Sequence, residues 1–224
     1  MLSEPEKIRV LFQKTGPLKF ISHLDLDRTM KAAFLRARLP IKYTEGFNPH
    51  PKLVFSLPLS VGTASLCEFM DFRITEEIPK EEIRDRLNAA FPPDLRAIDV
   101  YTPETKFCEI GFASYDIVLH APEADEHTVS AIRAAFDAPM NVEKTGKGGT
   151  RTLDISPLCR LLSCEKTEDG IALSLRLSSS ETEFVNPRLP LDFLAAHIDA
   201  LPNDGDYTVC RTAVYRADGV TEFR

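Results

Sequence analysis

The chain has 224 residues, of which 43% are hydrophobic and 27% are charged. These ordinary proportions exclude an intrinsically disordered protein, and the length suits two domains of about 100 residues each. The formal net charge of −7 excludes a uniformly basic nucleic-acid-binding protein, so any anion-binding surface must be local.

Membrane and cofactor signals are missing from the sequence. No stretch reaches the roughly 18 apolar residues that cross a bilayer, and the first residues lack the basic and apolar regions of a signal peptide. We therefore expect a cytoplasmic protein without membrane contact. The five cysteines form no CxxC pair, so we expect reduced thiols, no metal and no other cofactor.

The first predicted elements are a strand and a helix. Residues 7–13 alternate apolar and polar side chains, which predicts a half-buried strand that Gly16 and Pro17 end. Ser22 can then cap a helix, with Asp25 returning the capping interaction, and apolar residues recur at helical spacing until Pro40.

The rest of the first half completes a β-α-β-β-α-β order. Residues 53–57 and 67–74 predict two strands, residues 79–91 predict a helix that begins at a proline, and residues 95–101 predict a closing strand. This order is that of a ferredoxin-like, split βαβ domain.

The second half predicts the same order. A break at residues 102–111 precedes strands at 115–120, 151–155, 171–178 and 207–215 and helices at 126–136 and 191–201. We therefore predict an α+β protein of two tandem ferredoxin-like domains with antiparallel sheets, residues 1–105 and 110–224.

Positive charge is concentrated near the start of the chain. Residues 7–52 carry ten basic and three acidic side chains, a net charge of +7 that leaves −14 for the remainder. This asymmetry indicates a basic face for an anionic ligand on an otherwise acidic body.

The least generic segment is the loop Gly46-Phe47-Asn48-Pro49-His50-Pro51. Because a residue before proline is pushed out of the α region, Asn48 and His50 are expected in extended backbone, and the loop is stiff. A stiff loop loses little entropy on binding, so Phe47, Asn48 and His50 are candidate ligand-binding residues.

The start of the first helix is a second candidate. His23 and Asp25 lie where free N–H groups and the helix dipole favour a phosphate. His23 and His50 could instead act as acid and base with Asp25 orienting them, so an RNA-acting enzyme stays open. We predict that His23, Asp25, Asn48 and His50 converge on one exposed cleft.

A glycine-rich run at residues 145–151 resembles a phosphate loop only superficially. The pattern GxxxxGK[ST] is missing and a strand is predicted to follow. We interpret this run as the tip of a hairpin.

The chain resembles the radical-SAM-linked protein family. The resemblance is carried by GPLKFISHLD at residues 16–25, GFNPHPK at 46–52 and PLSVG at 58–62. It implies an RNA or ribosome-linked role beside a radical SAM enzyme. The chain contains no CxxxCxxC and so does not itself hold the radical SAM cluster.

Together these observations predict an RNA-binding or substrate-presenting accessory protein whose partners are a structured tRNA or rRNA and a radical SAM enzyme. A protein–protein adaptor without nucleic acid is the other alternative. The candidate binding residues supply phosphate contacts, stacking surfaces and polar recognition: Lys19, Ser22, His23, Arg28, Lys31, Tyr43, Phe47, Asn48, His50 and Lys52.

Overall fold

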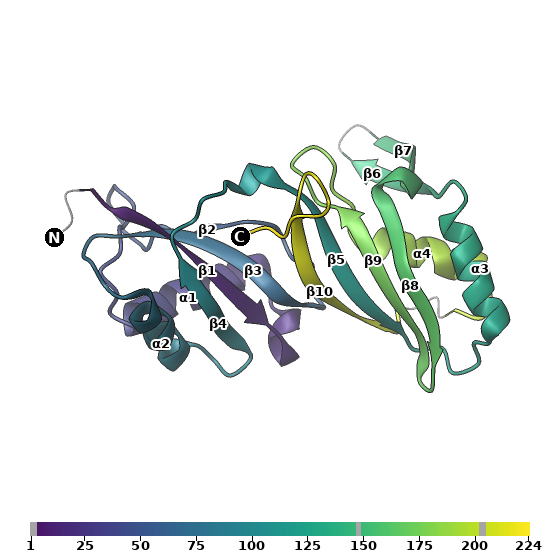
Figure 1. The fold of residues 1–224 in the computed structure, drawn as a ribbon, viewed down its shortest axis with the longest axis horizontal. Coiled ribbons are helices and arrows are strands. Elements are labelled where there is room, and N and C mark those ends of the chain that lie inside the picture. The colour runs from purple at the N-terminus through teal and green to yellow at the C-terminus, as the bar shows by residue number, and fades with distance from the viewer. Residues whose placement is uncertain (1–3, 147–148, 202–204) are drawn as a thin grey trace. The chain divides into compact units, whose positions relative to one another are not determined.

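The computed structural model describes residues 4–146, 149–201 and 205–224. The chain divides into two compact units, which we call unit 1 (Met1–Phe107 with Arg224) and unit 2 (Cys108–Phe223). The division falls inside the predicted break at residues 102–111. Figure 1 labels the elements of both units.

Unit 1 has the predicted element order. Its strands and helices are β1 (Glu6–Lys14), η1 (Gly16–Phe20), α1 (His23–Arg36), β2 (Val54–Phe55), β3 (Thr63–Ile74), α2 (Lys80–Ala90) and β4 (Leu95–Tyr101). Ser22 caps α1 as predicted, because its side chain accepts a hydrogen bond from the Asp25 N–H at 3.1 Å. The strand predicted at 53–57 is only two residues long.

The sheet of unit 1 is antiparallel. Its strand order is β4-β1-β3, with β2 paired to the other side of β3. One core joins the sheet to both helices and includes Val10 of β1, Phe72 of β3, Phe34 of α1 and Leu87 of α2 (Figure 1). The opposite face of the sheet carries neither α1 nor α2, and we call it the helix-free face.

Unit 2 contains more strands than the sequence predicts. Its elements are η2 (Phe107–Glu109, which starts in unit 1), β5 (Ile110–Leu119), α3 (Glu126–Phe136), β6 (Asn141–Gly146), β7 (Gly149–Asp154), η3 (Ser156–Leu158), β8 (Cys159–Thr167), β9 (Gly170–Ser178), α4 (Arg188–His197) and β10 (Tyr207–Arg216). The antiparallel order of its main sheet is β10-β5-β9-β8.

The predicted strand at 151–155 is assigned to the wrong sheet. It is β7, which pairs with β6 in a separate two-stranded hairpin, and the strand beside β9 is β8, which the sequence prediction missed. The ladder between β8 and β9 shifts register between Leu161 and Ser163, so β8 does not keep a period of two along its length.

The helices of unit 2 were easier to predict. Helix α3 has the predicted bounds, and Asp125 caps it in a capping box with Thr128. Helix α4 begins earlier and ends earlier than the predicted 191–201. Among the described residues no helix is long and apolar enough to cross a membrane.

Candidate functional site

A row of four basic residues crosses unit 1 on adjacent chain segments. Lys7 of β1 is the direct register partner of Arg73 of β3. The Lys42 N–H donates to the Arg73 carbonyl at 2.8 Å, and the Lys52 N–H donates to the Lys42 carbonyl at 3.2 Å. Because neighbouring extended segments lie about 4.8 Å apart, this basic row is about 14 Å long.

The basic row lies on the helix-free face. Ile8 and Ile74 are buried in the core, so their neighbours Lys7 and Arg73 project to the other side of the sheet. Lys42 follows buried Ile41 in the same way. Backbone pairing therefore fixes the common direction of these cations.

The basic row borders a cavity of about 220 Å³ whose lining includes all four cations, Val54 and Asp71. Lys42 is half-buried and Lys52 is exposed. In the part of the chain that the structure describes, neither ammonium group has an ion pair or a side-chain hydrogen bond. Two uncompensated lysines at one cavity favour an anionic ligand.

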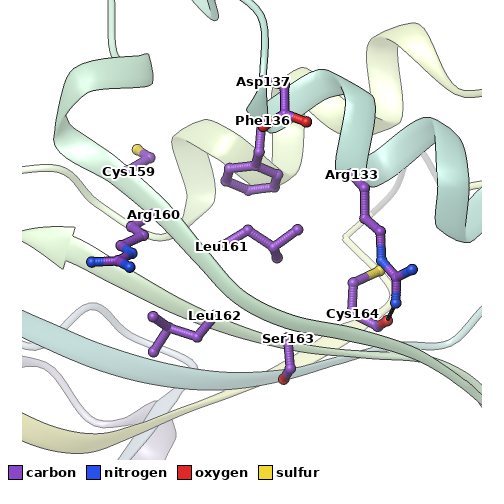
Figure 2. A pocket seen from close by; sticks show the side chains of 9 residues that line it. All are labelled: Arg133, Phe136, Asp137, Cys159, Arg160, Leu161, Leu162, Ser163 and Cys164. Atoms are coloured by element: carbon purple, nitrogen blue, oxygen red, sulfur yellow. Dashed lines mark hydrogen bonds between the residues drawn. The ribbon is translucent and has the colours of Figure 1, made fainter.

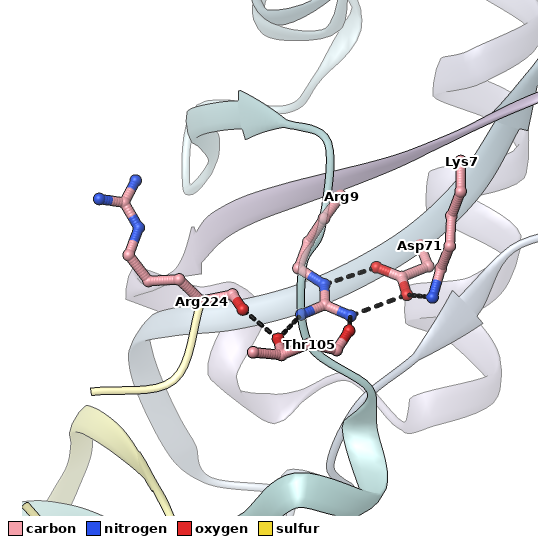
Figure 3. A network of polar contacts seen from close by, with 5 residues as sticks. All are labelled: Lys7, Arg9, Asp71, Thr105 and Arg224. Atoms are coloured by element: carbon pink, nitrogen blue, oxygen red, sulfur yellow. Dashed lines mark hydrogen bonds and ion pairs between the residues drawn. The ribbon is translucent and has the colours of Figure 1, made fainter. Parts of the chain in front are cut away.

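A buried ion pair lies beside the basic row (Figure 3). The Arg9 guanidinium, which is 0% exposed, donates to both carboxylate oxygens of Asp71 at 2.7 and 3.0 Å. The Lys7 ammonium approaches the same carboxylate at 2.7 Å. One carboxylate thus serves two cations, and the local charge stays positive.

Neighbouring residues hold Arg9 in a fixed position. Its Nη1 donates to the Thr105 hydroxyl at 2.7 Å, and its Nη2 donates to the Thr105 carbonyl at 3.0 Å. The Thr105 hydroxyl in turn donates to the Arg224 carbonyl, and the guanidinium of Arg9 lies over the Phe107 ring, 4.4 Å from its centroid. Asp71 is therefore anchored at the wall of the cavity by a fixed arginine.

The predicted residues at the start of α1 have partners of their own. The His23 ring packs edge-on against Phe55, with centroids 5.2 Å apart. Asp25 accepts from the Ser22 hydroxyl at 2.7 Å and from Arg28 at 3.0 Å, and these contacts, Ser22 first, hold the pKa of Asp25 below its usual value.

The remaining predicted cations of this region are also engaged. Lys31 pairs with Asp27 at 2.6 Å, so its charge is matched on its own helix. The Lys19 ammonium lies 5.1 Å from the centroid of the Phe20 ring. The uncompensated positive charge of unit 1 is thus more prominent at Lys42 and Lys52 than on α1.

The loop at 45–50 forms the tip of an extended hairpin. Tyr43 bridges Pro51, and the Thr44 N–H donates to the His50 carbonyl at 2.9 Å. The His50 Nδ1 lies 3.2 Å from both the Thr44 hydroxyl and the Asn48 carbonyl. At the tip, Phe47 is fully exposed and Asn48 is exposed.

The predicted convergence of His23, Asp25, Asn48 and His50 stays a prediction. His23 contacts β2, whereas His50 contacts its own loop, and the two rings share no partner among these contacts. Four residues lie between His50 and Phe55, the contact of His23, and the five steps along the chain span up to about 17 Å when extended.

The family comparison covers most of the chain and both units. A family model described as "Uncharacterized protein conserved in bacteria (DUF2344)" matches residues 7–187. The chain belongs to this bacterial family. The matched region contains the whole basic row, and no curated protein matches the chain.

Sequence reasoning identified Lys52 but missed Lys7, Lys42 and Arg73 as parts of one site. Lys7 and Lys42 were visible in the excess of positive charge at 7–52, but Arg73 lies outside it. Only the register of β1 with β3 brings Arg73 to Lys7. The composition thus showed the excess of positive charge, but it did not show which of the basic residues lie side by side.

Unit 2 contains a larger open pocket of about 580 Å³ between the end of α3 and β8. Figure 2 shows Arg133 and Arg160 at opposite sides of it, with Phe136 and Leu161 between them. Burial raises the pKa of Cys159 to about 12 and also raises that of Cys164, so both thiols stay protonated near neutral pH.

Two further sequence predictions concern the glycine-rich run and a metal site. The tip of the glycine-rich run, Lys147 and Gly148, lies outside the described residues, while β6 and β7 pair on either side of it. Within residues 4–146, 149–201 and 205–224, no cluster of three or more histidine, cysteine, aspartate or glutamate side chains is arranged to hold a metal ion.

Proposed function

We propose that this protein is a cytoplasmic RNA-binding accessory protein that presents RNA to a modifying enzyme. The basic row of unit 1 is the observation that carries this proposal. It places Lys42 and Lys52, neither of which is paired within the described chain, at a cavity with Lys7 and Arg73. A line of cations about 14 Å long suits successive phosphates of one strand.

The loop next to the basic row supports RNA over a small anion. Phe47 is fully exposed at a loop tip that two X-Pro steps stiffen, and Tyr43 lies at its base. Exposed aromatic rings beside backbone-binding cations are typical of surfaces that stack on unpaired bases. Arg28 and Lys31, which already face carboxylates, contribute less in this proposal.

The nature of the RNA and of the enzyme rests on the motif resemblance. We propose a structured tRNA or rRNA as the ligand and a radical SAM enzyme as the partner. Both units are proposed to be ferredoxin-like, which the orders β4-β1-β3-β2 and β10-β5-β9-β8 support if β8 takes the role of the second strand. Purification from the native cell should recover the enzyme together with RNA, and recovery of neither contradicts this part.

The acid–base alternative receives no support from the histidines. A general acid and a general base must both reach the reacting atoms of one substrate. His23 packs against Phe55, and His50 bonds within its own loop.

Direct binding tests the proposal. Lys42→Gln and Lys52→Gln should each weaken binding of a fluorescently labelled RNA by about fivefold, because each removes about 1 kcal/mol of charge-assisted contact. Arg28→Gln and Arg84→Gln, whose cations already pair with Asp25 and Asp85, serve as controls and should change affinity less than twofold. Equal losses in all four variants would refute a local site.

A further inference from the structure

Two arginines of unit 2 occupy directly opposite positions. Arg160 of β8 is the register partner of Arg176 of β9. Side chains at opposite positions project to the same face with Cβ atoms about 5 Å apart, and like charges there destabilise the sheet. Unit 2 therefore keeps two cations side by side at a cost in stability.

The pair faces away from the core that β8 and β9 share with α3. Cys164 of β8 is buried beside α3, with its Sγ 4.0 Å from the Val129 carbonyl, and its register partner is buried Leu173. Arg176 lies three residues after Leu173 and so projects to the opposite face of the sheet. Arg160 shares that face because it pairs with Arg176.

Arg176 is held in place by neutral groups. Its guanidinium stacks on the Tyr215 ring, 4.1 Å from the centroid, and its Nη1 donates to the Gly219 carbonyl at 2.6 Å. Its Nε lies 3.5 Å from the Ser114 hydroxyl. These contacts fix the side chain and leave its charge uncompensated.

Arg160 provides the second cation. It is exposed, and among the described residues it has no ion pair and no side-chain hydrogen bond. Both arginines line one cavity of about 340 Å³, together with Phe112, Leu158 and Val220. This volume is in the range of natural small-ligand sites.

One acid, Asp218, lines the same cavity. Its carboxylate accepts from the Thr221 hydroxyl at 2.6 Å and from the N–H groups of Val220 and Thr221, both at 2.9 Å. Its hydrogen-bonding capacity is thus largely used within its own turn. The lining carries two cations against one anion.

We propose that the cavity between Arg160 and Arg176 binds a phosphate group. Guanidinium groups bind phosphate oxygens through paired, charge-assisted hydrogen bonds, and a bound phosphate would remove the repulsion between the two arginines. The phosphate belongs either to an RNA strand or to a small phosphorylated molecule. This inference stands on unit 2 alone and does not depend on the RNA-binding function of unit 1.

Calorimetric titration of the full chain with inorganic pyrophosphate tests the site. Arg160→Gln should bind one equivalent fewer per chain than the unchanged protein, whether or not the basic row of unit 1 binds a second equivalent. Arg151→Gln removes an exposed cation from β7 of the same unit and should leave the stoichiometry unchanged. Full stoichiometry in Arg160→Gln, or no binding by the unchanged protein, overturns the proposal.

Thermal unfolding supplies a second, independent readout. Without phosphate, Arg160→Gln should raise Tm by about 1–2 °C because it removes a like-charge pair. With saturating pyrophosphate, its Tm should fall below that of the unchanged protein. A lower Tm in both conditions would assign Arg160 a structural role and overturn the proposal.

The same variant distinguishes the two sources of the phosphate. Titrations with adenosine 5′-monophosphate and with a short RNA should both be compared between Arg160→Gln and Arg151→Gln. A loss of affinity confined to RNA assigns the site to a strand, and a loss that includes the mononucleotide assigns it to a small molecule. Undiminished affinity for both contradicts phosphate binding here.

Discussion

The helix-free face of unit 1 and the face of unit 2 opposite α3 carry the same motif in two different settings. Each has a pair of cations directly opposite one another, Lys7 with Arg73 in unit 1 and Arg160 with Arg176 in unit 2. Unit 1 adds the acid Asp71 next to its pair, whereas unit 2 holds Arg176 by an aromatic ring and a carbonyl.

This difference separates charges that stabilise the fold from charges that are available to bind a ligand. In unit 1 Asp71 belongs to a buried ion pair with Arg9, and the cations available to a ligand are Lys42 and Lys52. In unit 2 the neutral contacts of Arg176 orient a cation and leave its charge available to a ligand. Removal of the acid should therefore damage the fold of unit 1, and removal of Arg160 should not damage that of unit 2.

The largest effect is expected from Asp71→Asn. The substitution removes the carboxylate that accepts two hydrogen bonds from the Arg9 guanidinium, which is 0% exposed. Breaking a buried pair from one side costs about 3–5 kcal/mol, which urea unfolding should detect. The double variant Arg9→Met with Asp71→Leu should recover much of this loss, since it removes both members of the buried pair. Asp85→Asn, at an exposed pair, should cost about 0–1 kcal/mol. A loss for Asp71→Asn no larger than this control would contradict a structural role of the buried pair.

A smaller effect on stability is expected from two carboxylates that each accept a hydrogen bond from a hydroxyl three residues away. In unit 1 the hydroxyl of Ser22 lowers the pKa of Asp25, and in unit 2 the hydroxyl of Thr221 is the main cause that lowers the pKa of Asp218 to about 2. Because the folded pKa of Asp218 lies below the unfolded value of about 3.9, it stabilises the fold above about pH 4. That contribution should disappear as the pH falls from about 4 to 2.

Thr221→Val tests this assignment. Loss of the hydroxyl should raise the pKa of Asp218 toward its usual value, as followed by NMR titration of the side-chain carboxyl. The pKa of Asp25 should stay where it is, since its hydroxyl belongs to the other unit. An unchanged pKa of Asp218 would contradict the assignment and would show that the backbone N–H groups alone lower the pKa.

The sequence predicted the elements whose pattern is regular. The bounds of α3 agree with the prediction because its apolar residues recur at helical spacing. The bounds of β4 also agree, although its ladder with β1 shifts register between Asp99 and Ala97. Strand β8 was missed because the register shift between Leu161 and Ser163 interrupts its alternation, and because Arg160, Glu165 and Lys166 give it a polar composition. The strand at 151–155 was found, but a sequence pattern does not specify its pairing partner.

The basic row of unit 1 was predictable only in part, because strand pairing brings its residues together. Lys52 stands out beside a conspicuous loop, and the excess of positive charge at 7–52 is visible in the composition. Arg73 joins Lys7 and Lys42 through the register of β1 with β3 and one backbone hydrogen bond. Cross-strand neighbours of this kind depend on tertiary pairing, which residue spacing does not encode.

The salt dependence of RNA binding tests the central claim most directly. If the basic row neutralises phosphates, log K for a single-stranded RNA should fall linearly with log salt concentration, with a slope of about −0.7 for each phosphate neutralised. The double variant Lys42→Gln with Lys52→Gln should reduce the steepness of this slope by about 1.4, and Arg28→Gln should leave it nearly unchanged. A slope that is the same in the unchanged protein and in the double variant would contradict the account.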